Sequence, residues 1–189
     1  MDVALGPYET VALWRGLWQG PVGPFEGRFW QHEALALEPR PHQPDGPPLW
    51  IAGEGPKTLE RTGAAFDGWL PFSATPEGFA AGLAAVRKAS ADAGRDPAAV
   101  TAAAYLTVTV DDDEDSAAEE QRAFMERYYG VPYDFMRAFQ GCAAGSADAV
   151  ADWLRGYVEA GAEHIVLRLG SGDPGTQLTR VAPLLAALA

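Results

Sequence analysis

A glycine-rich stretch between a short apolar run and a helical segment has the residues to bind an anion. The apolar run Leu49–Ala52 is followed by Gly53–Pro56 and then by a helical pattern over Lys57–Ala65. Glycines let the backbone approach an oxyanion, and the amides and dipole of a helix N-terminus favour negative charge. Lys57 and Thr58 would add a cation and a hydroxyl. The stretch therefore predicts a phosphate site, with a tight turn that needs a positive φ as the alternative.

Other polar clusters give weaker signals. The loop Gly170–Gly175 follows the last apolar strand, where Arg168 could neutralise a phosphate, and a plain turn into the last helix is the competing interpretation. The acidic run Asp111–Asp115 fits the solvated start of a helix better than a metal site, because acids suit the helix dipole. No metal spacing and no catalytic triad can be drawn from the scattered histidines, which leaves the catalytic residues unknown. These histidines are His32, His42 and His164.

Strand and helix patterns alternate along most of the chain. The first predicted helix, Tyr8–Gly20, is followed by a Pro/Gly-rich excursion, Pro21–Pro48, which we expect on the surface. The predicted strands are Leu49–Gly53, Asp67–Phe72, Thr101–Val110 and Glu163–Gly170, the last of which we expect to be buried, and Cys142 is expected in a loop. The predicted helices after the excursion are Lys57–Ala65, Pro76–Ala93 with Thr75 as N-cap, Asp113–Tyr129, Tyr133–Gln140, Ser146–Ala160 and Pro174–Ala189, the last interrupted or kinked at Pro183.

Four strands, each followed by a helix, predict an α/β fold with a parallel sheet and right-handed crossovers. Four βα units are half of an eight-stranded barrel, which usually takes about 250 residues. An open four-stranded sheet is the competing architecture. We expect a single domain over residues 1–189, with 21–48 as the surface excursion.

Composition narrows the possible partners. A net charge of −12 argues against nucleic acid or an anionic membrane as the main partner, because both need a basic face. The N-terminus lacks the pattern of a signal peptide, and no apolar run is long enough to span a membrane. A single cysteine, Cys142, fits a reducing compartment. We therefore expect a cytoplasmic protein that acts on a small-molecule substrate.

Several ordered segments resemble one known family. These are "ETVALWRGLW", "FEGRFWQHEALALEPRPHQPDGPPLWIAGEGPKTLERTGAAFDGWLP", "AGRDPAAV" and "GSADAVADWLRGYVEAGAEHIVLRL". Together they resemble the C-terminal half of the luciferase-like monooxygenases, which are FMN- or coenzyme F420-dependent oxidoreductases built on a (β/α) TIM barrel. The resemblance implies a flavoprotein-type oxidoreductase. It also implies that Gly53, Glu54, Gly55 and Lys57, with Thr58, surround the phosphate of FMN or F420.

The segments that resemble the family do not include its first four barrel strands, which carry the usual catalytic residues. The implied enzyme is therefore incomplete in this chain, and whether the chain acts as an enzyme alone is left open. Exposed strand edges favour a homo-oligomer or a complementary half-barrel chain. The alternative function is a non-catalytic flavin-binding or partner-completing half barrel. A sugar-phosphate barrel enzyme would also use Gly53 and Gly172, but it leaves the excursion unexplained.

Overall fold

The computed structural model describes residues 6–188 and divides into two compact units, residues 1–49 and 50–189. In the part of the chain that is described, no helix has the length and apolar character needed to cross a bilayer. The expectation of one domain over residues 1–189 stays a prediction.

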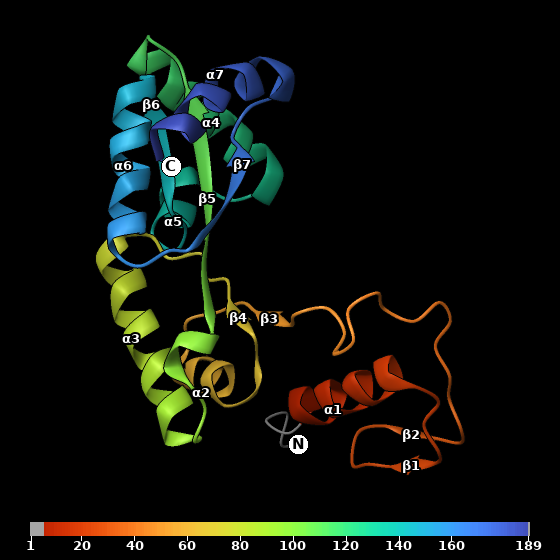
Figure 1. The fold of residues 1–189 in the computed structure, drawn as a ribbon. Coiled ribbons are helices and arrows are strands. Elements are labelled where there is room, and N and C mark those ends of the chain that lie inside the picture. The colour runs from red at the N-terminus through yellow and green to blue at the C-terminus, as the bar shows by residue number, and fades with distance from the viewer. Residues whose placement is uncertain (1–5, 189) are drawn as a thin grey trace. The chain divides into compact units, whose positions relative to one another are not determined.

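The first unit contains a helix, a short hairpin and the long loop that follows them (Figure 1). Helix α1 (Gly6–Gln19) confirms the first predicted helix, and β1 (Phe25–Glu26) pairs antiparallel with β2 (Gln31–His32). The carboxylate of Glu9 accepts hydrogen bonds from the backbone amides of the hairpin turn. The donors are Arg28 at 3.1 Å, Phe29 at 3.1 Å and Trp30 at 2.8 Å. All of residues 21–48 are exposed or half-buried, as predicted for the excursion.

The second unit contains the alternating strands and helices. Its strands are β3 (Trp50–Ile51), β4 (Gly68–Trp69), β5 (Thr101–Val110), β6 (Cys142–Gly145) and β7 (His164–Leu169). Its helices are α2 (Pro56–Ala65), α3 (Pro76–Asp92), the 3-10 turn η1 (Pro97–Ala99), α4 (Glu114–Tyr129), α5 (Tyr133–Arg137), α6 (Ala147–Glu159) and α7 (Pro174–Leu188).

All strand pairs of the second unit are parallel, as predicted, and β5 is the central strand. Strand β4 pairs with the start of β5, β6 with Thr107–Val110, and β7 with Ala103–Val108. The amides of Thr101 and Thr107 donate to Asp67 and Gly141 respectively, whereas the carbonyl of Ala102 accepts from Glu163. Strands β4 and β6 therefore follow one edge of β5, and β7 occupies the other.

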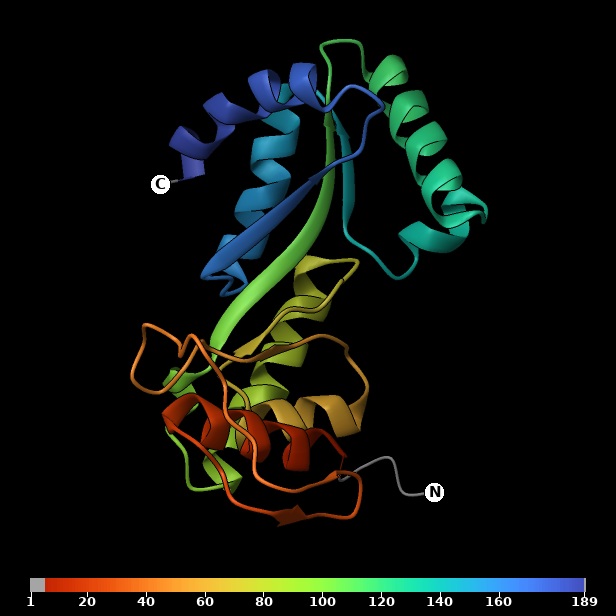
Figure 2. The same ribbon diagram turned by 90° about the vertical axis from the view of Figure 1, so that its right-hand side faces the viewer.

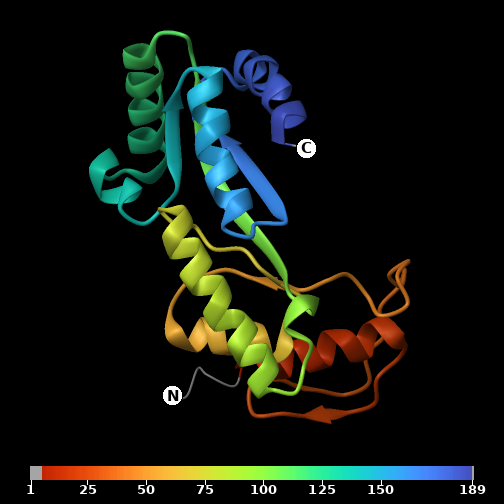
Figure 3. The same ribbon diagram turned by 60° about the vertical axis from the view of Figure 1, so that its left-hand side comes forward.

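The two faces of β5 have different surroundings. Its even-numbered residues from Ala102 to Val110 belong to the hydrophobic core, together with Phe79, Leu83 and Leu154 from the helices. Helices α4, α6 and α7 surround the second half of β5 (Figures 2 and 3). The odd-numbered residues, including Tyr105 and Thr107, lie on the opposite face. This alternation follows from the two-residue period of a strand.

Three details differ from the sequence prediction. Cys142 lies in strand β6 rather than in a loop, because Cys142–Gly145 pairs with Thr107–Val110. Strand β7 is half-buried rather than buried, since only its odd-numbered residues, Ile165, Leu167 and Leu169, pack against the core. Helix α7 continues through Pro183 without interruption.

Close packing of α2 on α3 predicts a steric effect at Gly63. An added Cβ at this position would lie 2.5 Å from the backbone nitrogen of Ser90 and 2.6 Å from the carbonyl oxygen of Val86. We expect Gly63→Ala to lower the free energy of unfolding by about 1–3 kcal/mol, as overpacking does. Urea denaturation followed by circular dichroism measures it.

The matched control is Gly78→Ala, also within a helix. Its Cβ would meet only the Thr75 hydroxyl oxygen, at 3.5 Å. Because alanine favours helix, this variant should keep or raise stability by up to about 1 kcal/mol. Equal stability of the two variants would contradict the close packing of α2 on α3.

Candidate functional site

The loop between β3 and α2 has a conformation that favours glycine. Gly53 has a φ of 110°, in the region that L side chains rarely adopt. Its carbonyl oxygen accepts a hydrogen bond of 2.8 Å from the indole nitrogen of Trp69, a fully buried residue at the end of β4. The loop is therefore held against the neighbouring strand. The tight turn with a positive φ, which is the alternative to a phosphate site, is therefore present at Gly53. This turn is also compatible with an anion bound at the same loop.

The N-terminus of α2 lacks the side-chain cap found on neighbouring helices. Its N-cap residue, Gly55, has no side chain to offer, Pro56 occupies the first helical position, and the first turn contains no acid. By contrast, α3, α4 and α6 begin with side-chain caps and acidic first turns; the caps are Thr75, Asp113 and Ser146. Lys57 is exposed and Thr58 is half-buried in this first turn. A negatively charged group bound here would be stabilised by the helix dipole and by the ammonium of Lys57, and no carboxylate of the first turn would repel it.

Glu54, the acidic member of the predicted set, is engaged elsewhere. Its carboxylate accepts a hydrogen bond from the hydroxyl of Ser73, a buried residue after β4. The carbonyl oxygen of Ser73 in turn accepts a 2.8 Å bond from the hydroxyl of Tyr157. Burial raises the pKa of Tyr157, and the Glu54 charge adds to this. The carboxylate of Glu54 is thus hydrogen-bonded to Ser73. Glu54 can contribute to an anion site at α2 only through its backbone.

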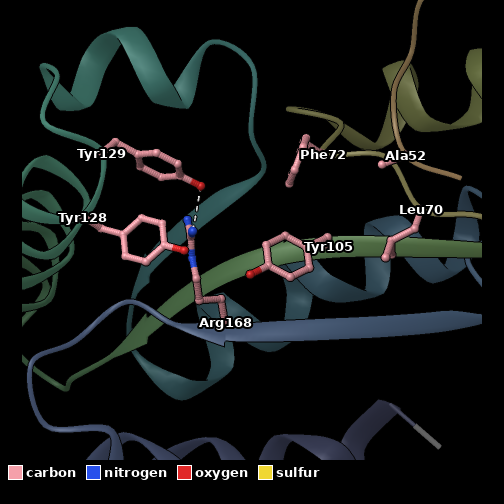
Figure 4. Close-up of a pocket in the computed structure, with 7 residues that line it drawn as sticks. All are labelled: Ala52, Leu70, Phe72, Tyr105, Tyr128, Tyr129 and Arg168. Atoms are coloured by element: carbon pink, nitrogen blue, oxygen red, sulfur yellow. Dashed lines mark hydrogen bonds between the residues drawn. The ribbon is translucent and has the colours of Figure 1, made fainter.

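A pocket of about 390 Å³ lies beside this loop (Figure 4). Its residues come from the ends of β3 and β4, from β5 and β7, and from the end of α4. They are Ala52, Leu70, Phe72, Tyr105, Tyr128, Tyr129 and Arg168. A smaller hollow of about 110 Å³ shares Phe72 and Tyr129 with it and is completed by Met136, Phe139 and Gln140. The volume of the larger pocket is within the usual range of small-molecule sites, about 300–1,000 Å³.

Arg168 is the only cationic side chain of this lining, and it is held by a ring of neutral hydrogen bonds. Its Nη2 donates to the hydroxyl oxygen of Thr107 at 2.8 Å and to Oε1 of Gln140 at 3.1 Å. Its Nη1 donates to the hydroxyl of Tyr129 at 2.7 Å, the bond drawn in Figure 4. Tyr129 and Gln140 are themselves connected, and Gln140 donates back to Thr107. The guanidinium is therefore fixed in one orientation.

Strand register produces this arrangement. Thr107 is the pairing partner of Cys142 in β6 and of Arg168 in β7, so the three residues form one row across three strands. Burial raises the pKa of the Cys142 thiol, and the charge of Arg168 and a hydrogen bond from Thr107 oppose that rise. A slip of one residue in β7 would move Arg168 to the core face.

The remaining predicted polar segments are used for capping. In Gly170–Gly175, the carboxylate of Asp173 accepts from the amide of Thr176 at 3.2 Å at the start of α7. Asp113 caps α4, and Asp111 pairs with Arg180 at 2.6 Å. Hydrogen bonds and Arg180 lower the pKa of Asp111. Among the described residues, no group of three or more potential ligands could hold a metal ion.

The sequence predicts the glycine loop but not the aromatic walls of the pocket. Tyr128 and Tyr129 end α4, and Tyr105 is one of several β5 residues with no distinguishing neighbour in sequence. The sequence associates Arg168 with the loop that follows β7, whereas its side chain turns to Thr107 on β5. The tyrosine pair before the terminating Gly130 is the one local signal that could have indicated the pocket.

Parallel βα units with a pocket and a glycine loop at the carboxyl ends of the strands define this chain as an α/β protein built from the units that also form (β/α) barrels. A family model described as luciferase-like monooxygenase matches residues 8–164. The chain belongs to the luciferase-like monooxygenase family, in agreement with the resemblance of its sequence.

Curated relatives are matched over part of their length. A phthiodiolone/phenolphthiodiolone dimycocerosates ketoreductase of Mycobacterium bovis is 38% identical over 100 residues, 51% of this chain and 26% of the relative. An F420-dependent hydroxymycolic acid dehydrogenase of Mycobacterium tuberculosis is 34% identical over 109 residues, 58% of this chain and 29% of the relative. The matched part thus spans between a quarter and a third of these relatives.

Solved structures extend the match to nearly the whole chain. An F420-dependent secondary alcohol dehydrogenase in complex with an F420–acetone adduct superposes with a TM-score of 0.81 at 22% identity, covering 96% of this chain and 60% of that protein. A riboflavin lyase with modified FMN gives a TM-score of 0.75 at 13% identity, covering 98% and 57%. At these identities the likeness shows the fold.

The hydrogen-bond ring around Arg168 makes Thr107 important for stability. We expect Thr107→Val to lower the free energy of unfolding by about 1–3 kcal/mol, because it removes an acceptor from a partly buried cation and from Gln140. Thr101→Val, the same change at the start of β5, should change stability much less, since no hydrogen bond of its hydroxyl is found among the described residues. Chemical denaturation of both variants measures the difference. Equal losses would show that the ring contributes nothing.

Proposed function

We propose that this chain is the cofactor-binding part of a luciferase-like oxidoreductase that uses FMN or coenzyme F420. The phosphate of the cofactor binds at Gly53, Glu54, Gly55, Lys57 and Thr58. The small-molecule substrate is oxidised or reduced in the adjoining pocket. A single cysteine among 189 residues supports a cytoplasmic location for this chemistry.

The observation that carries the proposal is the uncapped N-terminus of α2. Gly53 and Gly55 leave the backbone accessible, and the first turn offers Lys57 and the Thr58 hydroxyl without an acid. Glu54 contributes through its backbone, since its carboxylate is bonded to Ser73. Pro56 has no N–H and the amide of Thr58 donates to the carbonyl oxygen of Gly55 at 2.8 Å, so the donors of this first turn that suit a phosphate are the amide and ammonium of Lys57 and the hydroxyl of Thr58.

The pocket beside the loop fits the ring system of such a cofactor. Ala52 directly precedes Gly53 in the chain and lines the pocket, so a molecule held by its phosphate at α2 can reach the apolar walls formed by Leu70 and Phe72. When bound, the cofactor supplies the hydride or electron chemistry. The residues of the chain bind it, orient it and exclude water around it.

A second candidate is a non-catalytic half barrel that binds a flavin or completes a partner. The residues that line the pocket include three tyrosines and one arginine, but neither a carboxylate nor a histidine. The chain also covers about 60% of the dehydrogenase it resembles in fold. For the oxidoreductase, an acid or base that this lining does not provide would come from a complementary half-barrel chain or from a second copy of this one.

Comparing FMN with riboflavin tests the phosphate site, because riboflavin lacks the phosphate. We expect the chain to bind FMN more tightly than riboflavin, and Lys57→Gln to weaken FMN binding about tenfold with riboflavin unchanged. Lys88→Gln is the matched control, since Lys88 is the only other lysine of the sequence and pairs with Asp92 on α3. A fluorescence titration measures these affinities, and F420 is titrated in parallel.

Equal affinities for FMN and riboflavin would contradict the proposal that the loop at the start of α2 binds the phosphate. Activity separates the two candidate functions. Oxidation of reduced FMN or F420 in a mixture with the N-terminal half of a structural relative is expected for the oxidoreductase. Cofactor binding without any turnover in that mixture would favour the non-catalytic half barrel.

A further inference from the structure

Among the described residues, the positive charge of Arg168 has no negative partner. The chain has 26 acidic and 14 basic side chains, and most of the ion pairs in the structure involve exposed residues. Within the described residues, however, Arg168 forms no ion pair, although it is partly buried. Removing a charge from water without a counter-ion is costly, so an unpaired cation in a pocket calls for an explanation.

The surroundings of Arg168 orient the charge without neutralising it. Its bonded partners are two hydroxyls, an amide oxygen and a thioether, all of them neutral: Thr107, Tyr129, Gln140 and Met125. The Cys142 thiol in the same row does not supply a charge near neutral pH, because burial raises its pKa. One N–H of Nη1 has no bonded partner among the described residues, and Nη1 is the nitrogen that faces Tyr129 in the pocket.

Aromatic rings enclose the guanidinium. Its central carbon lies 5.0 Å from the ring centre of Tyr129, 5.1 Å from that of Tyr128 and 5.7 Å from that of Tyr105. Ring faces attract a cation and displace water, but they carry only partial negative charge. In this less polar setting, a bound anion would interact with Arg168 more strongly than it would in water.

The rest of the pocket is apolar. Ala52, Leu70 and Phe72 form the side away from Arg168 in Figure 4. The adjoining hollow continues past Phe72 and Tyr129 to Met136 and Phe139. A molecule that extends from Arg168 past Phe72 into this hollow therefore meets one fixed cation at one end and apolar or aromatic side chains along its length. It leaves the side of Ala52 and Leu70 to the cofactor ring.

From this arrangement we infer that the substrate of the site is an organic carboxylate with an apolar or aromatic body, bound with its carboxylate on the guanidinium of Arg168. That the bound molecule is a substrate rests on the proposed function. That it is a carboxylate with an apolar body rests on the geometry of the pocket. The remaining N–H of Nη1 can donate to one carboxylate oxygen, and the hydrogen-bond ring fixes the guanidinium in advance of binding. Arg168 is thus a specificity residue.

The experiment is a calorimetric titration of the chain with 2-naphthoate and with 2-naphthamide, its neutral counterpart of the same shape. We expect naphthoate to bind about tenfold more tightly, the size of a hydrogen bond to a charged group. Arg168→Gln should abolish this preference, and Arg168→Lys should retain part of it. Arg155→Gln, which removes an exposed cation of α6 paired with Asp152, should keep the preference unchanged.

Equal affinity of the wild-type chain for the two probes, or a preference that persists in Arg168→Gln, would overturn the inference. If a variant fails to fold, the wild-type comparison alone still decides between the two outcomes. Repeating the titration with FMN present separates the sources of the anion. Displacement of naphthoate by FMN would show that Arg168 binds the cofactor, and it would overturn the inference that the substrate is a carboxylate. Loss of FMN binding in Lys57→Gln, with naphthoate binding unaffected, would bear on the phosphate site only.

Discussion

The parallel pairing of β5 along both of its edges is the constraint on which the second unit depends. Ten residues of one strand receive β4 and then β6 on one edge and β7 on the other, and this register brings Cys142, Thr107 and Arg168 into one row. Because side chains alternate with a period of two, the same register that places Leu106 and Val108 in the core places Thr107 at the pocket. Packing and site are therefore fixed by one set of backbone hydrogen bonds.

Placing a cation at the pocket requires compensation, and the structure supplies it with neutral groups. Four hydrogen-bond acceptors and several ring faces lower the cost of removing Arg168 from water, while no carboxylate among the described residues cancels its charge. The start of α2 likewise has a cation without an acidic partner in its first turn, where Lys57 lies. In a chain with a net charge of −12, both places keep a local positive potential available to a ligand.

The sequence predicts those features that depend on local signals. Alternating apolar runs and caps such as Thr75 predict four strands and the helices between them, and the glycines before Lys57 predict the loop. Strand β6 is missed because Cys142–Gly145 is short, rich in alanine and defined only by its pairing with β5. The pocket is missed because its residues come from five elements, and Arg168 reaches Thr107 across 61 residues of sequence. No local pattern reports such a contact.

That sequence separation also determines when the pocket is completed. A ribosome delivers β3, β4 and β5 well before β7, so the core face of β5 can begin to pack against α3 while Thr107 and Gln140 still lack their arginine. Long-range parallel pairing is also the slow part of folding, since a long loop must close before the contact forms. The pairing of β7 with Ala103–Val108 therefore completes the pocket, and loss of that pairing would separate Arg168 from Thr107 and Gln140.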